Sequence, residues 1–199
     1  MRSAVKAAFR VLATLAVTPA LISYGLRALV MGRDRALEGS SQGLSLIPGL
    51  MGQYLRRAFL SRTLAYCDAS AVVEFGVLFS QCGARLDANV YVGPRCHLGL
   101  VHLQRDVLLA AGVHVPSGAV THGTSAVGVP IRDQEGARSL VTIGEGTWIG
   151  SAAVIMADVG RHSVVGAGAV VTRSVPEYVV AAGVPAKVIK SRLTRPLGA

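Results

Sequence analysis

Aliphatic residues recur at every sixth position over long stretches of this chain, and the spacing predicts its main structural element. From residue 141 to 190 the repeat is regular, apart from one shortened step near Val159. An α-helix cannot keep one face buried on a period of six, whereas a coil of short strands joined by tight turns brings every sixth side chain to the same inner corner. We therefore expect a mainly β fold, a hexapeptide β-helix, with inner corners at Ile143, Ile149, Ile155, Val165 and Val171.

The same rhythm begins less regularly near Val73 and is interrupted once. Residues 121–140 contain glycine and charged residues but no period, and a loop of this length inside a compact repeat usually has a function. We expect a β-helix over 66–190 that carries this loop. The upstream inner corners are predicted at Val73, Phe79, Leu86, Val92, Leu98, Leu103, Leu109 and Val115.

Residues 1–65 lack this period and are expected to form a helical region that caps the coil or contacts a membrane. Residues 1–32 are mostly apolar, with a few basic residues between them. The uncharged run from Val11 to Leu26 is slightly shorter than the apolar run that a membrane-spanning helix needs. Pro19 lies within the run and could kink the helix. We expect a helix that lies on the cytoplasmic face of a membrane. The alternatives are packing on the protein's own core or on a partner subunit, and a true span.

A polar, glycine- and serine-rich segment at residues 32–43 is expected to be a loop, followed by a helix from about Pro48 to Leu64. An apolar stripe on this helix is flanked by Arg56, Arg57 and Arg62. Such a basic amphipathic helix can rest on anionic lipid or close one end of the coil. Residues 191–199 are polar and basic and are expected to form a flexible tail.

Composition narrows the classes of partner. The 199 residues carry a net charge of +9, which favours anionic partners. Nucleic acid is not expected, because no basic run is interleaved with aromatic residues. Cys67, Cys82 and Cys96 are odd in number and lack the spacing of a metal site, so they are interpreted as reduced, buried thiols of a cytoplasmic protein.

Three blocks between residues 141 and 190 resemble hexapeptide-repeat O-acetyltransferases. They are WIGS at 148–151, then VVGAGAVVTRSVP, then AAGVPAKVIK. The upstream segments IPGLMGQYLRRAFL and VLLAAGVHVPSGAVTHG look more like the colanic-acid and capsule type of sugar O-acetyltransferase. The resemblance covers residues 46–190. It implies a left-handed parallel β-helix, assembly as a homotrimer, and acetyl-coenzyme A held in the groove between neighbouring subunits.

The resemblance also implies site residues. Acyl transfer to a hydroxyl needs a base for the hydroxyl proton, and imidazole is suited to this because its pKa lies near working pH. His122 stands where the coil gives way to the long loop, which is the place of the family's catalytic histidine. His114 and Trp148 are expected beside the acceptor, with a coil-surface or interface role as the alternative. The family's coenzyme positions correspond here to Ser151, Ala167, Thr172, Arg173, Lys187 and Lys190.

No metal is expected. His97 and His102 are five residues apart, as in the trimeric carbonic anhydrases of this fold, but no upstream histidine completes the set. The resemblance implies transfer of an acetyl group from acetyl-coenzyme A to a sugar or glycan precursor, and this is the activity that we expect. Two alternatives stay open at this point: an O-acetyltransferase acting on serine or another small molecule, and a non-catalytic trimeric scaffold.

Overall fold

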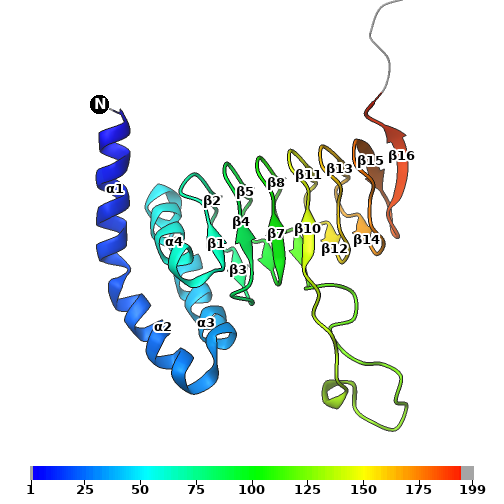
Figure 1. Ribbon diagram of the computed structural model, residues 1–199, viewed down its shortest axis with the longest axis horizontal. Coiled ribbons are helices and arrows are strands. Elements are labelled where there is room, and N and C mark those ends of the chain that lie inside the picture. Colours follow the sequence, from blue (N-terminus) through cyan, green and yellow to red (C-terminus); the bar gives the residue numbers. More distant parts are fainter. Residues whose placement is uncertain (1, 194–199) are drawn as a thin grey trace, which may run out of the picture.

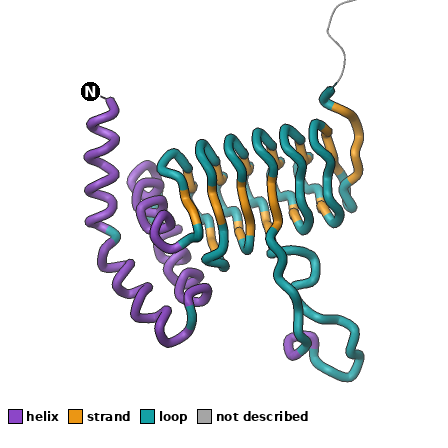
Figure 2. The backbone as a smooth tube through the Cα atoms, viewed as in Figure 1, coloured by secondary structure: helices purple, strands orange, loops and turns teal. Residues whose placement is uncertain are grey.

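The computed structural model describes residues 2–193, with side chains of the first helix from Ala7 onward, and consists of a helical region followed by a left-handed parallel β-helix (Figures 1 and 2). Most of the predicted flexible tail, residues 194–199, lies outside the described residues. The helices are α1 (Arg2–Ala16), α2 (Thr18–Met31), α3 (Arg33–Ser45) and α4 (Gly49–Thr63).

The β-helix has three faces, each a sheet of stacked short strands. Sheet A contains β1 (Tyr66–Cys67), β4 (Arg85–Leu86), β7 (Val101–Leu103) and β10 (Val141–Ile143). Sheet B contains β2 (Val72–Val73), β5 (Tyr91–Val92), β8 (Leu108–Leu109), β11 (Trp148–Ile149), β13 (Val164–Val165), β15 (Val179–Ala182) and β16 (Lys187–Ser191). Sheet C contains β3 (Leu78–Phe79), β6 (His97–Leu98), β9 (His114–Val115), β12 (Val154–Ile155) and β14 (Val170–Val171).

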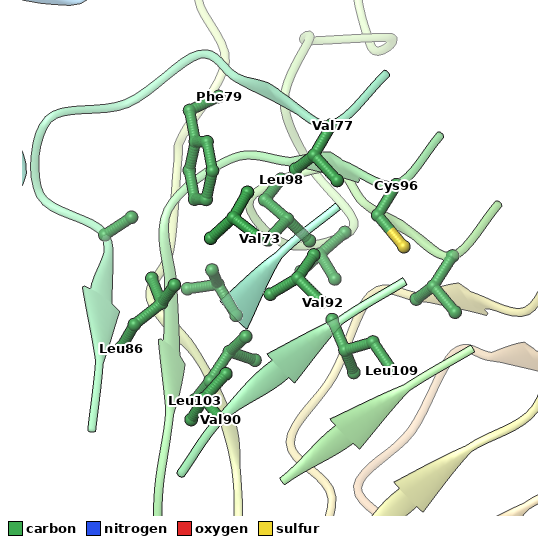
Figure 3. Packing of buried hydrophobic residues seen from close by; sticks show 14 of the residues in the cluster. Val73, Val77, Phe79, Leu86, Val90, Val92, Cys96, Leu98, Leu103 and Leu109 are labelled. Atoms are coloured by element: carbon green, nitrogen blue, oxygen red, sulfur yellow. The ribbon is translucent and has the colours of Figure 1, made fainter. Parts of the chain in front are cut away.

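The predicted inner corners form the core. Every one of them is no more than 1% exposed, and Figure 3 shows several of them, among them Phe79, Leu98 and Leu109, filling the space between the faces. A second buried residue lies two positions before many of these corners, as Val77 and Cys96 do before Phe79 and Leu98. The three cysteines are free and buried, as expected. The period of six therefore reflects one inward residue per strand plus one at the preceding turn.

Residues 32–43 are helical, so the prediction of a loop there is wrong. Most of this segment belongs to α3, which packs small buried residues against the coil. Ser40 donates a hydrogen bond to the Ala36 carbonyl, and the Ser41 hydroxyl both donates to the Phe79 carbonyl and accepts from the Phe79 amide. Glycine and serine favour loops by local propensity, but here their small size lets the helix lie close to β3.

Helix α4 begins and ends within one residue of the prediction and closes the first turn of the coil. Arg56, predicted to lie beside the apolar stripe, is instead buried at 2% exposure. Its guanidinium donates hydrogen bonds to the carbonyls of Val73, Leu44 and Ile47, which joins α4 to the coil, to the end of α3 and to the segment after it. This helix was predicted either to rest on anionic lipid or to close one end of the coil. The contacts of Arg56 support the second role, while Arg57 and Arg62 lie near the surface.

Helices α1 and α2 form one bent pair at the outside of the molecule (Figure 1). The break falls next to Pro19, where a kink was predicted, and the helix axes differ by 47°. Neither helix alone has the length and apolar character of a membrane span, and the bent pair meets that test only by length and composition.

The chain leaves the coil after β9 and returns at β10. The two legs of this excursion are joined by hydrogen bonds from Ser139 N to Ser117 O and from Ala137 N to Val120 O. A short 3-10 helix, Ile131–Asp133, lies near its tip. The excursion therefore includes the predicted loop 121–140 and starts slightly earlier, and Figure 2 shows it projecting to one side of the coil.

Candidate active site

The outer face of sheet C carries His114, and the turns at its edges carry four more of the predicted site residues. Parallel pairing places one outward residue per strand in a single column, in the order Leu78, His97, His114, Val154 and Val170. His97 and His114 therefore lie toward the helical end, and Val154 and Val170 lie toward the C-terminal end. The turns at the two edges of this sheet carry further predicted residues.

A cavity of about 590 Å³ lies at the helical end of this face. Its walls come from α3, from the strands and turns of sheet C, and from the legs of the excursion. The lining includes Asp34, Glu38, His97, His114, Thr121 and Arg138. Carboxylates, imidazoles and a guanidinium around one hollow can hydrogen-bond several hydroxyl groups at once, so the cavity has the chemistry to hold a sugar.

His97 and His114 stack in this cavity. Their ring centroids are 5.0 Å apart, and the ring planes differ by 2°. Partial burial, and then the neighbouring imidazole of His97, lower the pKa of His114 below its usual value of 6.5. Both effects disfavour the imidazolium form. His114 is therefore neutral near pH 7 and can accept or donate one hydrogen bond on each ring nitrogen.

His122 lies on the excursion, one residue after Thr121, and its side chain is exposed rather than part of the cavity wall. Its backbone is held by a close approach of the returning leg. A Cβ added to Gly136 would lie 2.2 Å from the Thr121 carbonyl oxygen and 2.6 Å from the His122 Cα. Only glycine allows this approach, so position 136 fixes where His122 emerges.

The predicted coenzyme residues flank sheet C beyond the histidines. Ser151 and Ala167 are exposed in stacked turns at the edge shared with sheet B, and Gly168 N donates to Ser151 O at 2.8 Å. Thr172 and Arg173 are exposed at the opposite edge, which is the edge from which the excursion leaves two turns earlier. These four residues therefore bracket one strip of the coil.

Lys187 and Lys190 lie on β16, which pairs antiparallel with β15 at the C-terminal end of sheet B. Both are exposed, and neither they nor Arg173 take part in the ion pairs formed among residues 7–193. Their charges therefore have no ion-pair partner among these residues and are available to an anion at this end of the coil.

Two predicted or considered residues lie on other faces. Trp148 is 51% exposed on sheet B, so within one subunit it does not lie beside His114. His102 lies on sheet A, where its Nε2 is 3.0 Å from a carboxylate oxygen of Asp87. His97 and His102 therefore point from different faces. Among the described residues no group of three or more His, Cys, Asp or Glu side chains could hold a metal ion.

The contribution of α3 to the cavity was not predicted from the sequence. Asp34 and Glu38 line the cavity, and Asp34 also accepts a hydrogen bond from the Cys82 amide at 2.8 Å. Asp34 and Glu38 are four residues apart, and in a helix this spacing places both carboxylates on one face. Because the segment was predicted to be a loop, the spacing was not interpreted in this way. That spacing was the available signal.

The sequence is similar to known acetyltransferases, although no family model matches it. It is 32% identical over 158 residues to a putative lipopolysaccharide biosynthesis O-acetyltransferase, WbbJ, of Escherichia coli, covering 69% of this chain and 81% of that protein. It is 54% identical over 52 residues to the E. coli galactoside O-acetyltransferase, covering 25% of this chain and 26% of that enzyme.

Solved structures of acetyltransferases have a similar fold. A maltose O-acetyltransferase from Clostridium difficile superposes with a TM-score of 0.68 at 21% identity, over 82% of this chain and 90% of that one. A galactoside acetyltransferase in complex with coenzyme A superposes with a TM-score of 0.66 at 25% identity, over 82% and 84%. From the coiled fold and the extended similarity to WbbJ, we conclude that this chain belongs to the hexapeptide-repeat acetyltransferase family.

Proposed function

We propose that this protein transfers an acetyl group from acetyl-coenzyme A to a hydroxyl of a sugar or glycan precursor of the exopolysaccharide, capsule or cell-surface type, with His122 as general base. The observation that carries the proposal is the outer face of sheet C. A polar, sugar-sized cavity opens at one end of this face, and the exposed turns that match the family's coenzyme positions flank the other end. The names of the relatives, which refer to lipopolysaccharide biosynthesis, maltose and galactoside, support the acceptor class.

The residues at the coenzyme end fit a long, thin, anionic donor. A Cβ added to Gly168 would meet no atom within 4 Å, so the strip beside Ala167 is open to a ligand. Backbone groups along such a strip can hydrogen-bond a pantetheine arm, and Arg173, Lys187 and Lys190 can hold its phosphates. When bound, acetyl-coenzyme A supplies a thioester carbonyl carbon as the electrophile and leaves as a thiol.

The chain's own residues would handle the proton. The His122 imidazole takes the proton of the acceptor hydroxyl as that oxygen forms its bond to the acetyl carbon, and the imidazolium then returns the proton to the departing sulfur. His114 and the α3 carboxylates orient the acceptor by hydrogen bonds. Trp148, which sits on sheet B, would act on the site of the facing subunit, and this assignment requires the homotrimer that we include in the proposal.

We place the reaction in the cytoplasm at the inner face of the cell membrane, with peripheral contact through residues 1–65. The exposed apolar surface of the N-terminal helices supports this location.

The decisive experiment is the substitution His122→Ala in the full chain, assayed by release of the coenzyme A thiol with galactoside, maltose and cell-surface glycan acceptors. Because general-base catalysis is worth about 10²–10⁴-fold, the turnover number should fall by that factor while acetyl-coenzyme A binding by calorimetry stays unchanged. His102→Gln, on another face, is the matched control and should retain activity. An unchanged turnover number in His122→Ala would overturn the proposal.

A further inference from the structure

Helices α1 and α2 share one outward face that is apolar along its length. Leu29 and Val30 are 85% and 86% exposed, and the other large residues of this face are each at least 60% exposed. We call this surface the outer face; its large residues are Val11, Leu12, Leu15, Ile22, Leu26, Leu29 and Val30. Isolated exposed leucines are ordinary, but a continuous apolar face of this length indicates a binding surface.

The pattern is one-sided. Ala13, Val17 and Tyr24, on the opposite side of the same helices, are buried against the rest of the molecule, and the Tyr24 hydroxyl lies 3.4 Å from the Cys82 sulfur. At 100° per residue, the exposed residues of both helices fall within one arc in spite of the bend at Pro19. The helices are therefore already docked on the protein by their inner side, and the outer face has no partner within the described chain.

The segment that carries this face has an excess of positive charge, and two of its cations lie at the end of α2. Residues 7–65 contain seven arginines and only two carboxylates, Asp34 and Glu38. None of the ion pairs formed among residues 7–193 involves a residue before Asp87. Arg33 and Arg35 are exposed directly after Leu29, Val30 and the end of α2. An apolar face with two cations at one end that form no ion pair is complementary to a layer that is apolar inside and anionic at its surface.

We propose that the outer face of α1 and α2 docks on an anionic lipid surface, with its aliphatic side chains in the acyl boundary and Arg33 and Arg35 at the level of the lipid phosphates. A second copy of this chain would bury the apolar residues equally well. Its residues 7–65 would offer Arg33 and Arg35 only two carboxylates, Asp34 and Glu38, and this is why the anionic lipid surface is the better occupant.

The docked orientation has a consequence for the acceptor, which rests on the function proposed above. Helix α3 starts directly after Met31, and its residues Asp34, Arg35 and Glu38 line the cavity at the helical end of sheet C. A lipid surface at the end of α2 is therefore within one or two helical turns of the cavity wall. The acceptor that suits this arrangement is a glycan held at the membrane by a lipid, rather than a free sugar in solution.

Flotation of the full-length protein with vesicles tests the docking. It should float with vesicles of phosphatidylcholine containing phosphatidylglycerol, and less with phosphatidylcholine alone. Leu26→Gln/Val30→Gln removes two exposed side chains without opening the core, and should weaken binding at least about tenfold. Arg33→Gln/Arg35→Gln should weaken binding to the anionic vesicles by roughly 30-fold and abolish the preference for them.

Matched controls change the same residue types elsewhere. Ile189 and Leu193 are 63% and 71% exposed at the far end of the coil, so Ile189→Gln/Leu193→Gln should float as the unchanged protein does. Arg95→Gln/Arg132→Gln removes the same charge from other exposed positions. Circular dichroism should show that all four variants are folded. Inorganic phosphate at millimolar concentration should not compete, because the partner is a surface and not a free anion.

A site-specific probe locates the contact. The three natural cysteines are buried, and burial raises the pKa of Cys67 to about 12 and of Cys96 to about 11, so they resist labelling. Leu29→Cys introduces one accessible thiol on the outer face. An environment-sensitive fluorophore there should shift to the blue and brighten with anionic vesicles, whereas the same label at Arg132→Cys should not change.

Each outcome decides the proposal. Flotation that is unchanged in Leu26→Gln/Val30→Gln, or absent in the full chain, would overturn it. A loss of oligomeric mass in that variant by light scattering, without flotation of the unchanged protein, would assign the face to subunit contact instead. The catalytic proposal is tested separately, because His122→Ala should float normally; a floating chain that never transfers acetyl groups would remove the enzyme function and leave the docking intact.

Discussion

The imidazole rings of His97 and His114 lie parallel, 5.0 Å apart, although sixteen residues separate them along the chain. The pairing of β6 with β9 places them on adjacent turns of the same face. Burial, and then the neighbouring His97 ring, therefore disfavour a positive charge on His114 and lower its pKa.

This pair predicts a dependence of stability on pH. Because partial burial and His97 lower the pKa of His114 in the folded state, the unfolded chain binds more protons at mildly acid pH. The contribution of His114 to stability should be complete above its unfolded pKa, about 6.5, and be lost as the pH falls below that value. Urea unfolding at pH 8 and pH 5.5 measures the difference.

Replacing the neighbour isolates the cause. In His97→Gln the like charge is absent, so the pKa of His114 measured by NMR titration should rise toward its usual value and the loss of stability at acid pH should shrink. A His114 pKa that stays unchanged in His97→Gln would show that the stacking has no electrostatic effect. His162→Gln, whose ring stacks on Tyr178 at a distant turn, is the control.

The cationic residues at the C-terminal end predict a phosphate-specific loss of affinity. Arg173→Ala and Lys190→Ala should each weaken coenzyme A binding by about tenfold or more, because a charge-assisted hydrogen bond is worth about 1.5–3 kcal/mol. The loss should shrink with dephospho-coenzyme A for whichever residue meets the 3′-phosphate. Isothermal titration measures both ligands. Arg161→Ala, whose guanidinium is already paired with Glu177, should bind normally, and equal losses in all three variants would contradict the assignment.

Substitution of Arg56 should cause a large loss of stability and have little effect on coenzyme A binding. Its guanidinium donates hydrogen bonds to three backbone carbonyls, and its Nη2 atom is buried without a hydrogen-bond partner among the described residues. Arg56→Met should lower the free energy of unfolding by about 3 kcal/mol, since the carbonyls lose a charged donor. In the control Arg57→Met, only the contact of the Arg57 guanidinium with the Tyr54 ring at 4.7 Å is lost, so the change should be below about 1 kcal/mol.

Stacking of the coil predicts which glycines tolerate a methyl group. A Cβ at Gly150 would lie 2.5 Å from the Ala167 amide nitrogen, and neither backbone can move without separating two turns. Gly150→Ala should therefore lower the melting temperature, at a cost of about 1–3 kcal/mol. Gly128→Ala, in the excursion, meets no atom within 4 Å and should be neutral. Equal melting temperatures for the two variants would show that the turns can relax.

Local pattern was sufficient for the coil, because its period is a property of consecutive residues. Ile143, Ile149 and Ile155 are equivalent corners in the sequence and in the structure. The kink at Pro19 also follows from local chemistry, since proline lacks the amide that an uninterrupted helix needs. His122 was identified from its position before the loop and from the family resemblance, and its catalytic role stays a prediction.

Other features depended on contacts between distant residues. Residues 32–43 have the composition of a loop, yet packing against β3 makes them helical, and only that helix carries Asp34 and Glu38 into the cavity. The spacing of His97 and His102 suggests a pair, but a corner of the coil places them on different faces. His97 stacks on His114 instead, and His102 contacts the Asp87 carboxylate. The sequence by itself determined the repeat, because burial at every sixth residue is encoded in the order of its apolar residues. Only the tertiary structure decided which side chains meet across neighbouring turns of the coil. The register between these turns depends on the number of residues that each corner contains.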